Sequence, residues 1–271
     1  MKNKMLLGIL IIILLLVGIL ITINVKENKQ EDSLQRILDK GTLILGLDDS
    51  FPPMGFRNEN NEIVGFDIDV AKEVAKRLNV KLKLQPISWT AKEQELNSYN
   101  IDCIWNGMSV NEERKQSMSL SIPYLENSMS FVAKEDNSIN TLEDLKGKKV
   151  GVQSGSTAEE ILQESEIYSE LEEVISYTDN ITAFMDLEIN QIDSVFLDNV
   201  VANYYITSNN KPYKVLEEGL EEEEYAIGFR KQDTELTDKV NEILLEMKKD
   251  GSLAKISEKW FGEDITIVKE K

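Results

Sequence analysis

A lone arginine closes the segment 101–114, IDCIWNGMSVNEER, after a strand candidate, a glycine turn and a serine. The planar guanidinium of Arg114 can hold a carboxylate through two parallel hydrogen bonds. Gly107 lets backbone N–H groups approach the same anion, and Ser109 adds a hydroxyl beside it. The segment therefore suits the capture of a carboxylate, although a surface arginine at the start of a helix would have the same sequence.

Acidic and aromatic residues follow the strand predicted at 42–47. Asp48 comes directly after this apolar run, and Phe51 precedes two prolines. Open α/β sheets bind ligands in the crevice at the carboxyl ends of their strands, which is where we expect these side chains. Asp49 offers a second carboxylate for a positively charged ligand, but it could equally point into solvent.

The second half of the chain repeats this arrangement of strands followed by polar residues. A strand predicted at 149–153 leads into Ser154-Gly155-Ser156-Thr157 and a helix at 158–162. The start of a helix presents free N–H groups and the positive end of its dipole to an anion, although simple helix capping gives the same pattern. Asp198 separates a strand at 194–197 from a helix at 199–206, so it is an N-cap, a ligand-facing carboxylate, or both.

The composition of the chain argues against several classes of function. The chain has 271 residues, 29% of them charged, and a net charge of −19. Such acidity argues against a surface for nucleic acid or anionic membrane. The single cysteine, Cys103, excludes an internal disulfide and is expected to be a buried, inert thiol. Histidine is absent, which disfavours hydrolase or zinc chemistry, so we expect no metal and no cofactor.

The first 25 residues differ from the rest. Lys2 and Lys4 precede an uncharged, mainly aliphatic run at 5–23, long enough to cross a bilayer with its N-terminus in the cytoplasm. We predict a signal or membrane anchor at 1–25 and a linker at 26–32. The run is long for a secretory signal and has no Ala-x-Ala site, which favours an uncleaved anchor over a cleaved signal. Either way, the remainder lies outside the cytoplasm.

A weak internal repeat indicates two lobes. Leu96, Ile101 and Asp102 recur with the same spacing as Leu187, Ile192 and Asp193, each set ending a helix before a strand. Alternating strands and helices predict mostly parallel βαβ units in both halves. Other predicted elements are a hairpin at 56–65, helices at 67–78 and 235–249, a capping-box-like helix start at 141–144, and a solvated acidic connection at 221–224.

Seven short motifs occur in an order that is typical of one family. The chain resembles the amino-acid-binding bacterial extracellular solute-binding proteins, family 3, over residues 33–265. The resemblance implies an α/β fold of the type II periplasmic-binding-protein class, with mixed, mostly parallel sheets and a hinge crossed twice. Lobe 1 would comprise 33–126 and 225–265, and lobe 2 would comprise 127–224. The motifs are Phe51-Pro52-Pro53, Gly65-Phe66-Asp67-Ile68-Asp69, Gly107-Met108-Ser109 with Arg114, Pro123-Tyr124, Leu145-Lys146-Gly147-Lys148, Gly155-Ser156-Thr157-Ala158-Glu159 and Lys259-Trp260-Phe261-Gly262.

The resemblance also implies a site for a free amino acid between the lobes. Arg114 would grip the α-carboxylate, and Asp198 would pair with the α-ammonium. Asn106 stands where relatives often have a small apolar residue, which suggests a polar ligand side chain. Leu120, Ile122 and Leu197 also depart from the usual pattern. The expected ligand-binding residues are Asp48 and Gln153 at the side-chain end, Phe51 and Trp89 around the stem, Asn106 and Gly107 in the turn, and Ser109, Arg114, Thr157 and Asp198 around the backbone groups.

The function implied is that of a monomeric extracytoplasmic receptor that delivers a free amino acid to an ABC permease, with no catalytic residue and no nucleic-acid partner. A membrane-tethered sensor is the first alternative, although residues 1–4 leave no room for a cytoplasmic output domain. A dehydratase on the same fold is the second. An aspartate beside a substrate ammonium favours binding over chemistry.

Overall fold

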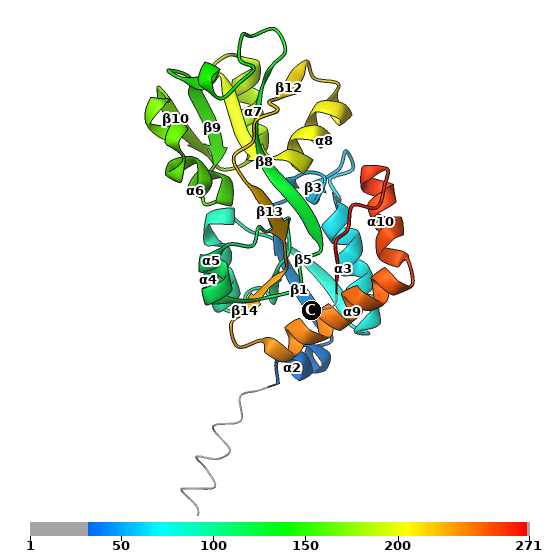
Figure 1. Ribbon diagram of the computed structural model, residues 1–271. Coiled ribbons are helices and arrows are strands. Elements are labelled where there is room, and N and C mark those ends of the chain that lie inside the picture. The colour runs from blue at the N-terminus through cyan, green and yellow to red at the C-terminus, as the bar shows by residue number, and fades with distance from the viewer. Residues whose placement is uncertain (1–31, 270–271) are drawn as a thin grey trace, which may run out of the picture.

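Two mixed sheets form the frame of the protein, and they lie one above the other in Figure 1. The computed structural model describes residues 32–269. The predicted signal or anchor at 1–25 and nearly all of the linker at 26–32 lie outside the described residues. Between residues 32 and 269, no helix combines the length and the apolar character that crossing a bilayer requires.

The first sheet has five strands in the order β5-β1-β6-β14-β7. Strand β1 pairs in parallel with β5 and β6, whereas β14 runs antiparallel to β6 and β7. The strand predicted at 42–47 is confirmed as β1, and it starts after Gly41, whose left-handed backbone ends the preceding helix. The strands are β1 (Thr42–Leu47), β5 (Lys81–Pro86), β6 (Cys103–Ile104), β7 (Met118–Leu120) and β14 (Gly228–Arg230).

The second sheet has the order β10-β9-β11-β8-β12. Its strand β9 pairs in parallel with β10 and β11, and β8 runs antiparallel to β11 and β12. The predicted class, α/β with mixed sheets, is confirmed. The strands are β8 (Leu125–Lys134), β9 (Lys149–Gln153), β10 (Glu173–Tyr177), β11 (Ser194–Asp198) and β12 (Tyr213–Val215).

The chain passes between the two sheets twice, through β8 and through β13 (Glu222–Tyr225). The two strands pair antiparallel, with Tyr225 opposite Leu125, and Figure 1 shows both running from one sheet toward the other. The segment predicted as a solvated connection at 221–224 does connect the sheets, and Glu221, Glu222 and Glu224 are exposed, but Glu223 is only partly exposed. Pairing with β8 turns alternate residues to opposite faces, so Glu223 points inward.

Helices surround both sheets, and their predicted apolar stripes are buried. The helix predicted at 67–78 is α3, and that at 235–249 is α9, which buries Leu236, Val240, Ile243, Leu244 and Met247. The helices are α2 (Ser33–Lys40), α3 (Phe66–Arg77), α4 (Lys92–Asn97), α5 (Glu112–Ser117), α6 (Thr157–Glu164), α7 (Asn180–Glu188), α8 (Asn199–Asn209), α9 (Thr234–Lys249) and α10 (Ser252–Phe261), with 3-10 turns η1 (Trp89–Ala91), η2 (Glu143–Leu145) and η3 (Glu166–Glu170).

Two local predictions can be compared directly with the structure. The helix start at 141–144 yields only the 3-10 turn η2, because Gly147 takes a left-handed backbone (φ +66°) directly after it. Asp144 does accept the N–H of Thr141 at 3.0 Å, as a capping box requires. The hairpin predicted at 56–65 is present as β3 (Gly55–Arg57) and β4 (Ile63–Val64), and β2 (Ser50–Phe51) pairs beside them.

The internal repeat corresponds to the same local structure in both sheets. Asp102 accepts the N–H of Ile44 at 2.7 Å, and Asp193 accepts the N–H of Lys149 at 2.9 Å. Each aspartate thus ties the turn before its strand to a neighbouring parallel strand of the same sheet, β1 for Asp102 and β9 for Asp193. A side chain at Gly46 would collide with Ile101, and one at Gly151 would collide with Ile192.

Candidate functional site

One cavity gathers every residue that the sequence predicted for the site. Its volume is about 20 Å³, far below the range of about 300 to 1,000 Å³ for small-molecule pockets, so the wall residues are closely packed around it. Residues from both sheets form its wall, which therefore depends on how the sheets face each other. The lining residues are Asp48, Phe51, Trp89, Asn106, Gly107, Ser109, Arg114, Met129, Gln153, Ser156, Thr157 and Asp198.

Arg114 contributes a buried positive charge to this wall. Its side chain comes from α5, which Asn111 caps by accepting the N–H of Arg114 at 2.8 Å. The residue is 4% exposed, and its Nη1 donates to the carbonyl of Ser109 at 2.7 Å. Among the described residues, no carboxylate oxygen lies within ion-pair distance of its guanidinium. Burial lowers the pKa of Arg114, since the charged form loses water.

The glycine turn is held from behind by a buried carboxylate. Gly107 has φ +56°, a left-handed backbone that favours glycine, and its N–H donates to Asp67 at 2.7 Å. This N–H is therefore already used and is not available to an anion in the cavity. Tyr124 donates to the same Asp67 oxygen at 3.0 Å, and burial raises the pKa of Asp67 to about 7.

The start of α6 combines ordinary capping with a donor that has no partner. Ser156 accepts the N–H of Glu159 at 3.1 Å, and the carboxylate of Glu159 accepts the N–H of Gly155 at 2.7 Å. These N–H groups are thus used inside the loop. The hydroxyl of Thr157 is buried in the cavity wall and makes no hydrogen bond within residues 32–269. Thr157 therefore offers a donor that a ligand can use.

Asp198 faces the cavity and does not cap its helix. It occupies the N-cap position of α8, yet its side chain makes no capping hydrogen bond. Its Oδ1 accepts hydrogen bonds from Asn127 at 2.9 Å and from the hydroxyl of Tyr225. The residue is 5% exposed, and burial raises its pKa. Of the sequence-based alternatives, the N-cap hydrogen bond is absent, and the carboxylate lines the cavity.

A second carboxylate, that of Asp48, lines the same cavity. Asp48 accepts the N–H of Ser50 at 2.9 Å and the amide of Gln153 at 2.7 Å. Burial, together with the negative charges of Asp179 and Asp49, raises its pKa to about 6. Asn106 accepts the N–H of Asp48 at 2.9 Å, while its own Nδ2 is buried with no partner among the described residues.

Asp49 is not part of the cavity wall. Its carboxylate accepts the Nε of Arg57 at 2.6 Å in the hairpin, and it is not a lining residue. The two aromatic residues predicted for the site are both buried and both line the wall. Lys92 lies over the Trp89 ring, 5.0 Å from its centroid, and donates to the carbonyl of Gly155 at 3.0 Å.

Sequence reasoning missed several residues of the site. Met129 and Ser156 line the cavity, and Asn127, Glu223 and Tyr225 stand behind Asp198. Ser156 belongs to the quoted 155–159 motif, so its cap position could have been found. The others lie on the strands that connect the sheets. No local pattern shows that β8 and β13 pass this cavity.

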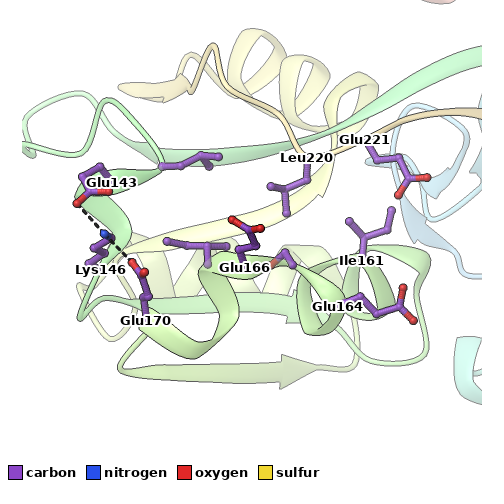
Figure 2. Close-up of a pocket in the computed structure, with 11 residues that line it drawn as sticks. Glu143, Lys146, Ile161, Glu164, Glu166, Glu170, Leu220 and Glu221 are labelled. Carbon is purple, nitrogen blue, oxygen red and sulfur yellow. Dashed lines mark ion pairs between the residues drawn. The ribbon is translucent and has the colours of Figure 1, made fainter.

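A wider hollow lies on the outside of the second sheet, between η2, α6 and the segment before β13 (Figure 2). Apolar side chains such as Ile161 and Leu220 point into it, and glutamates surround it. Lys146 is paired with Glu143 at 2.7 Å and with Glu170 at 2.8 Å, so this cation is already neutralised. The hollow holds none of the residues predicted for the site.

Two sheets joined by two crossing strands, with a cavity of opposite charges between them, define the class of two-lobed solute-binding proteins. The model of the bacterial extracellular solute-binding proteins, family 3, matches residues 43–263, and the chain belongs to this family. The predicted family and fold are confirmed. The family also confirms the expectation of a binding protein and not an enzyme.

Curated relatives and a solved structure agree with this membership. The L-cystine-binding protein TcyJ of Escherichia coli is 33% identical over 252 residues, which cover 92% of this chain and 94% of that protein. The arginine-binding extracellular protein ArtP of Bacillus subtilis is 34% identical, covering 82% and 87%. The structure of an ABC uptake transporter substrate-binding protein from Streptococcus pneumoniae with bound histidine matches with TM-score 0.84 and 35% identity, covering 88% and 99%.

Proposed function

We propose that this chain binds one free amino acid with a polar or positively charged side chain and delivers it to an ABC permease. The observation that carries the proposal is the buried guanidinium of Arg114, which has no carboxylate within ion-pair distance among the described residues. A buried charge without a counter-ion costs several kcal/mol, and an α-carboxylate in the cavity would remove that penalty. The Thr157 hydroxyl, which has no partner among the described residues, supplies a further donor on the same wall.

The two charged groups of an amino-acid backbone fit two ends of this wall. Arg114 would hold the α-carboxylate, with help from the region of Ser109 and Thr157. Asp198 would hold the α-ammonium, since Tyr225 and Asn127 already fix its orientation. Burial keeps both ion pairs from being screened by salt.

The remaining carboxylate selects the ligand side chain. Asp48 and Gln153 would face the end of this side chain, and Phe51 and Trp89 would pack along its stem. Once the carboxylate and ammonium of the ligand have paired with Arg114 and Asp198, the carboxylate of Asp48 remains. It can bind a positive charge or a hydrogen-bond donor on the side chain of the ligand. The unpartnered amide of Asn106 adds a donor beside it. The relatives named for arginine and histidine carry ligands of this kind.

The lobes that would close on the ligand follow the sheets. Residues 33–126 and 225–265 form one lobe in this proposal, and residues 127–224 form the other, with β8 and β13 as the hinge. Because Arg114 and Asp198 belong to different lobes, only the closed state satisfies both ends of the ligand, so binding favours closure. The receptor would act as a monomer on the extracytoplasmic face of the membrane. Segment 1–25 would tether it there, or it would be secreted if that segment is cleaved.

Thermal unfolding against a panel of amino acids tests the proposal. The full chain is kept in mild detergent and is unfolded and refolded to remove carried-over ligand. It is then heated with each common amino acid at millimolar concentration. A ligand at about 1,000 times its Kd adds roughly 4 kcal/mol of stability. For a protein of this size the unfolding midpoint should then rise by about 8 °C or more.

The matched variants are Arg114→Ala and Lys115→Ala. Lys115 is the exposed neighbour of Arg114 in α5, and its removal deletes the same charge outside the cavity. Arg114→Ala should abolish the rise, and Lys115→Ala should retain it. A folded wild-type protein whose midpoint rises with none of the amino acids would overturn the proposal.

A further inference from the structure

A second carboxyl group lies directly behind Asp198, in the strand β13. The amide of Asn127 donates to both residues, at 2.7 Å to Glu223 and at 2.9 Å to Asp198. One amide nitrogen therefore bridges the two carboxyl groups, which lie close together. Two neighbouring carboxylates that are largely withdrawn from water repel each other, so the pair favours a state in which it holds one proton.

The surroundings place this proton on Glu223 in the ligand-free protein. The hydroxyl of Tyr225 donates to Asp198, which stabilises its ionised form. Burial and the charge of Asp198 raise the pKa of Glu223 to about 8, although Asn127 and Ser109 act in the opposite direction. One oxygen of Glu223, Oε2, is buried with no hydrogen-bond partner among the described residues.

Other charged groups around the pair come from neighbouring elements. Arg114 on α5 attracts both carboxylates, and Glu160 on α6 and Glu93 on α4 surround Arg114 in turn. The adjacent residues of β13, Glu222 and Glu224, are exposed. Of these groups, Arg114 is the cation, and the proposed ligand carboxylate would neutralise it. The positive charge of the ligand ammonium at Asp198 would then decide whether Asp198 and Glu223 keep their shared proton.

We propose that Glu223 is a second carboxylate of the ammonium subsite, and that amino-acid binding expels the proton that Glu223 shares with Asp198. The inference rests on the proposed function, because it takes Asp198 as the partner of the α-ammonium. The ammonium, bound at Asp198, replaces the proton as the positive charge beside the two carboxylates. One proton passes from the carboxyl group of Glu223 to solvent for each ligand bound, and no covalent bond between heavy atoms changes.

The proposal predicts a direction for the effect of pH on affinity. An ammonium beside the pair favours its fully ionised form, so binding lowers the pKa of Glu223. At pH 7 the ligand-free protein holds the proton and the complex does not. Affinity should therefore rise as the pH increases from 6 to 8, by at most tenfold per pH unit, and should level off above about pH 8.

Calorimetric titration with L-arginine tests this release. The full chain is titrated at pH 7 in phosphate and in Tris, two buffers with different heats of ionisation, so the difference in binding heat counts the protons released. We expect nearly one proton for the wild type and clearly less for Glu223→Gln, whose amide imitates the protonated acid. The dissociation constants of the two proteins should be most similar at pH 6, and at pH 8 the wild type should bind well over tenfold more tightly than Glu223→Gln.

Glu224→Gln is the matched control, because it deletes the same charge from an exposed position of the same strand. It should release as many protons as the wild type. Asp48 can release a proton of its own near pH 6, and the comparison between variants subtracts that contribution. Binding of L-arginine without proton release, or with equal release from Glu223→Gln, would overturn this inference alone. Failure of every amino acid to bind would instead overturn the proposed function.

Discussion

The amide of Gln153 donates a hydrogen bond of 2.7 Å to the carboxylate of Asp48, and the two residues lie at the carboxyl ends of strands in different sheets. Gln153 ends β9 and Asp48 follows β1. This bond therefore exists only while the two sheets face each other closely. It also places the amide beside the carboxylate that we assign to the ligand side chain.

Asp48 should make the stability of the ligand-free protein depend on pH. Its pKa of about 6 in the folded protein lies above the ordinary 3.8, so folding is penalised once the unfolded chain ionises. The penalty is absent below pH 3.8, grows as the pH rises and is complete above about pH 6, where it reaches about 3 kcal/mol. Asp48→Asn should therefore raise the unfolding free energy by about this amount at pH 7 and by little at pH 4.

Urea unfolding of ligand-free protein at the two pH values measures this difference. Asp39→Asn, an exposed aspartate of α2, is the control for a general effect of lost charge. The same Asp48→Asn variant should bind L-arginine more weakly, since it lacks the counter-ion. Equal stability of Asp48→Asn and wild type at pH 7 would contradict the assignment of a buried, destabilising carboxylate.

Arg114→Lys separates the charge from the shape of the guanidinium. Lysine keeps the positive charge but cannot form two parallel hydrogen bonds with a carboxylate. We expect Arg114→Ala to lose roughly 2 to 5 kcal/mol of binding free energy, and Arg114→Lys to lose an intermediate amount. Ligand-free Arg114→Ala should unfold no earlier than wild type, because it removes a buried charge without a counter-ion. Calorimetry and thermal unfolding give the two quantities, and a strongly destabilised ligand-free Arg114→Ala would indicate a structural role.

Gly107→Ala should weaken both folding and binding. An added Cβ would stand 3.0 Å from Cε1 of Phe51 and 3.1 Å from Cε2 of Tyr225, which must both shift. Gly147→Ala is the matched control, because Gly147 has a similar φ of +66° but no atom within 4 Å of the added Cβ. Both variants should lose about 1 to 2 kcal/mol through backbone strain. Only Gly107→Ala should also lose affinity in a calorimetric titration, and equal affinities would refute the link between this turn and the cavity wall.

Tyr225→Phe should reduce affinity without removing any group that touches the ligand. The hydroxyl of Tyr225 orients and stabilises the ionised Asp198, and hydrogen bonds to charged groups contribute about 1.5 to 3 kcal/mol. We expect a fall in affinity of roughly tenfold or more at pH 7. Tyr177→Phe removes a comparable bond, 2.8 Å to Asp186, away from the cavity, and should leave the affinity unchanged. Parallel titrations check this pair, and a similar loss in both variants would point to general destabilisation.

The sequence determined the elements whose signals are local. The strand at 42–47 and the strand at 149–153 have the predicted bounds, because each is an apolar run that follows a lysine–glycine stop. The helix α9 is fixed by its own 3.6-residue stripe. The residues proposed for the site came partly from family motifs and partly from positions that follow predicted strands, and the structure brings them around one cavity.

Tertiary structure alone decided which groups inside that cavity are already occupied. The N–H of Gly107 is taken by Asp67, from a helix forty residues earlier in the chain, which no local pattern shows. Glu223 belongs to an acidic run that is hydrophilic in every residue. It turns inward because β13 pairs with β8 and a strand alternates its faces, so Glu222 and Glu224 point outward. Strand pairing between distant segments fixes these orientations, and the sequence of either segment by itself does not contain them.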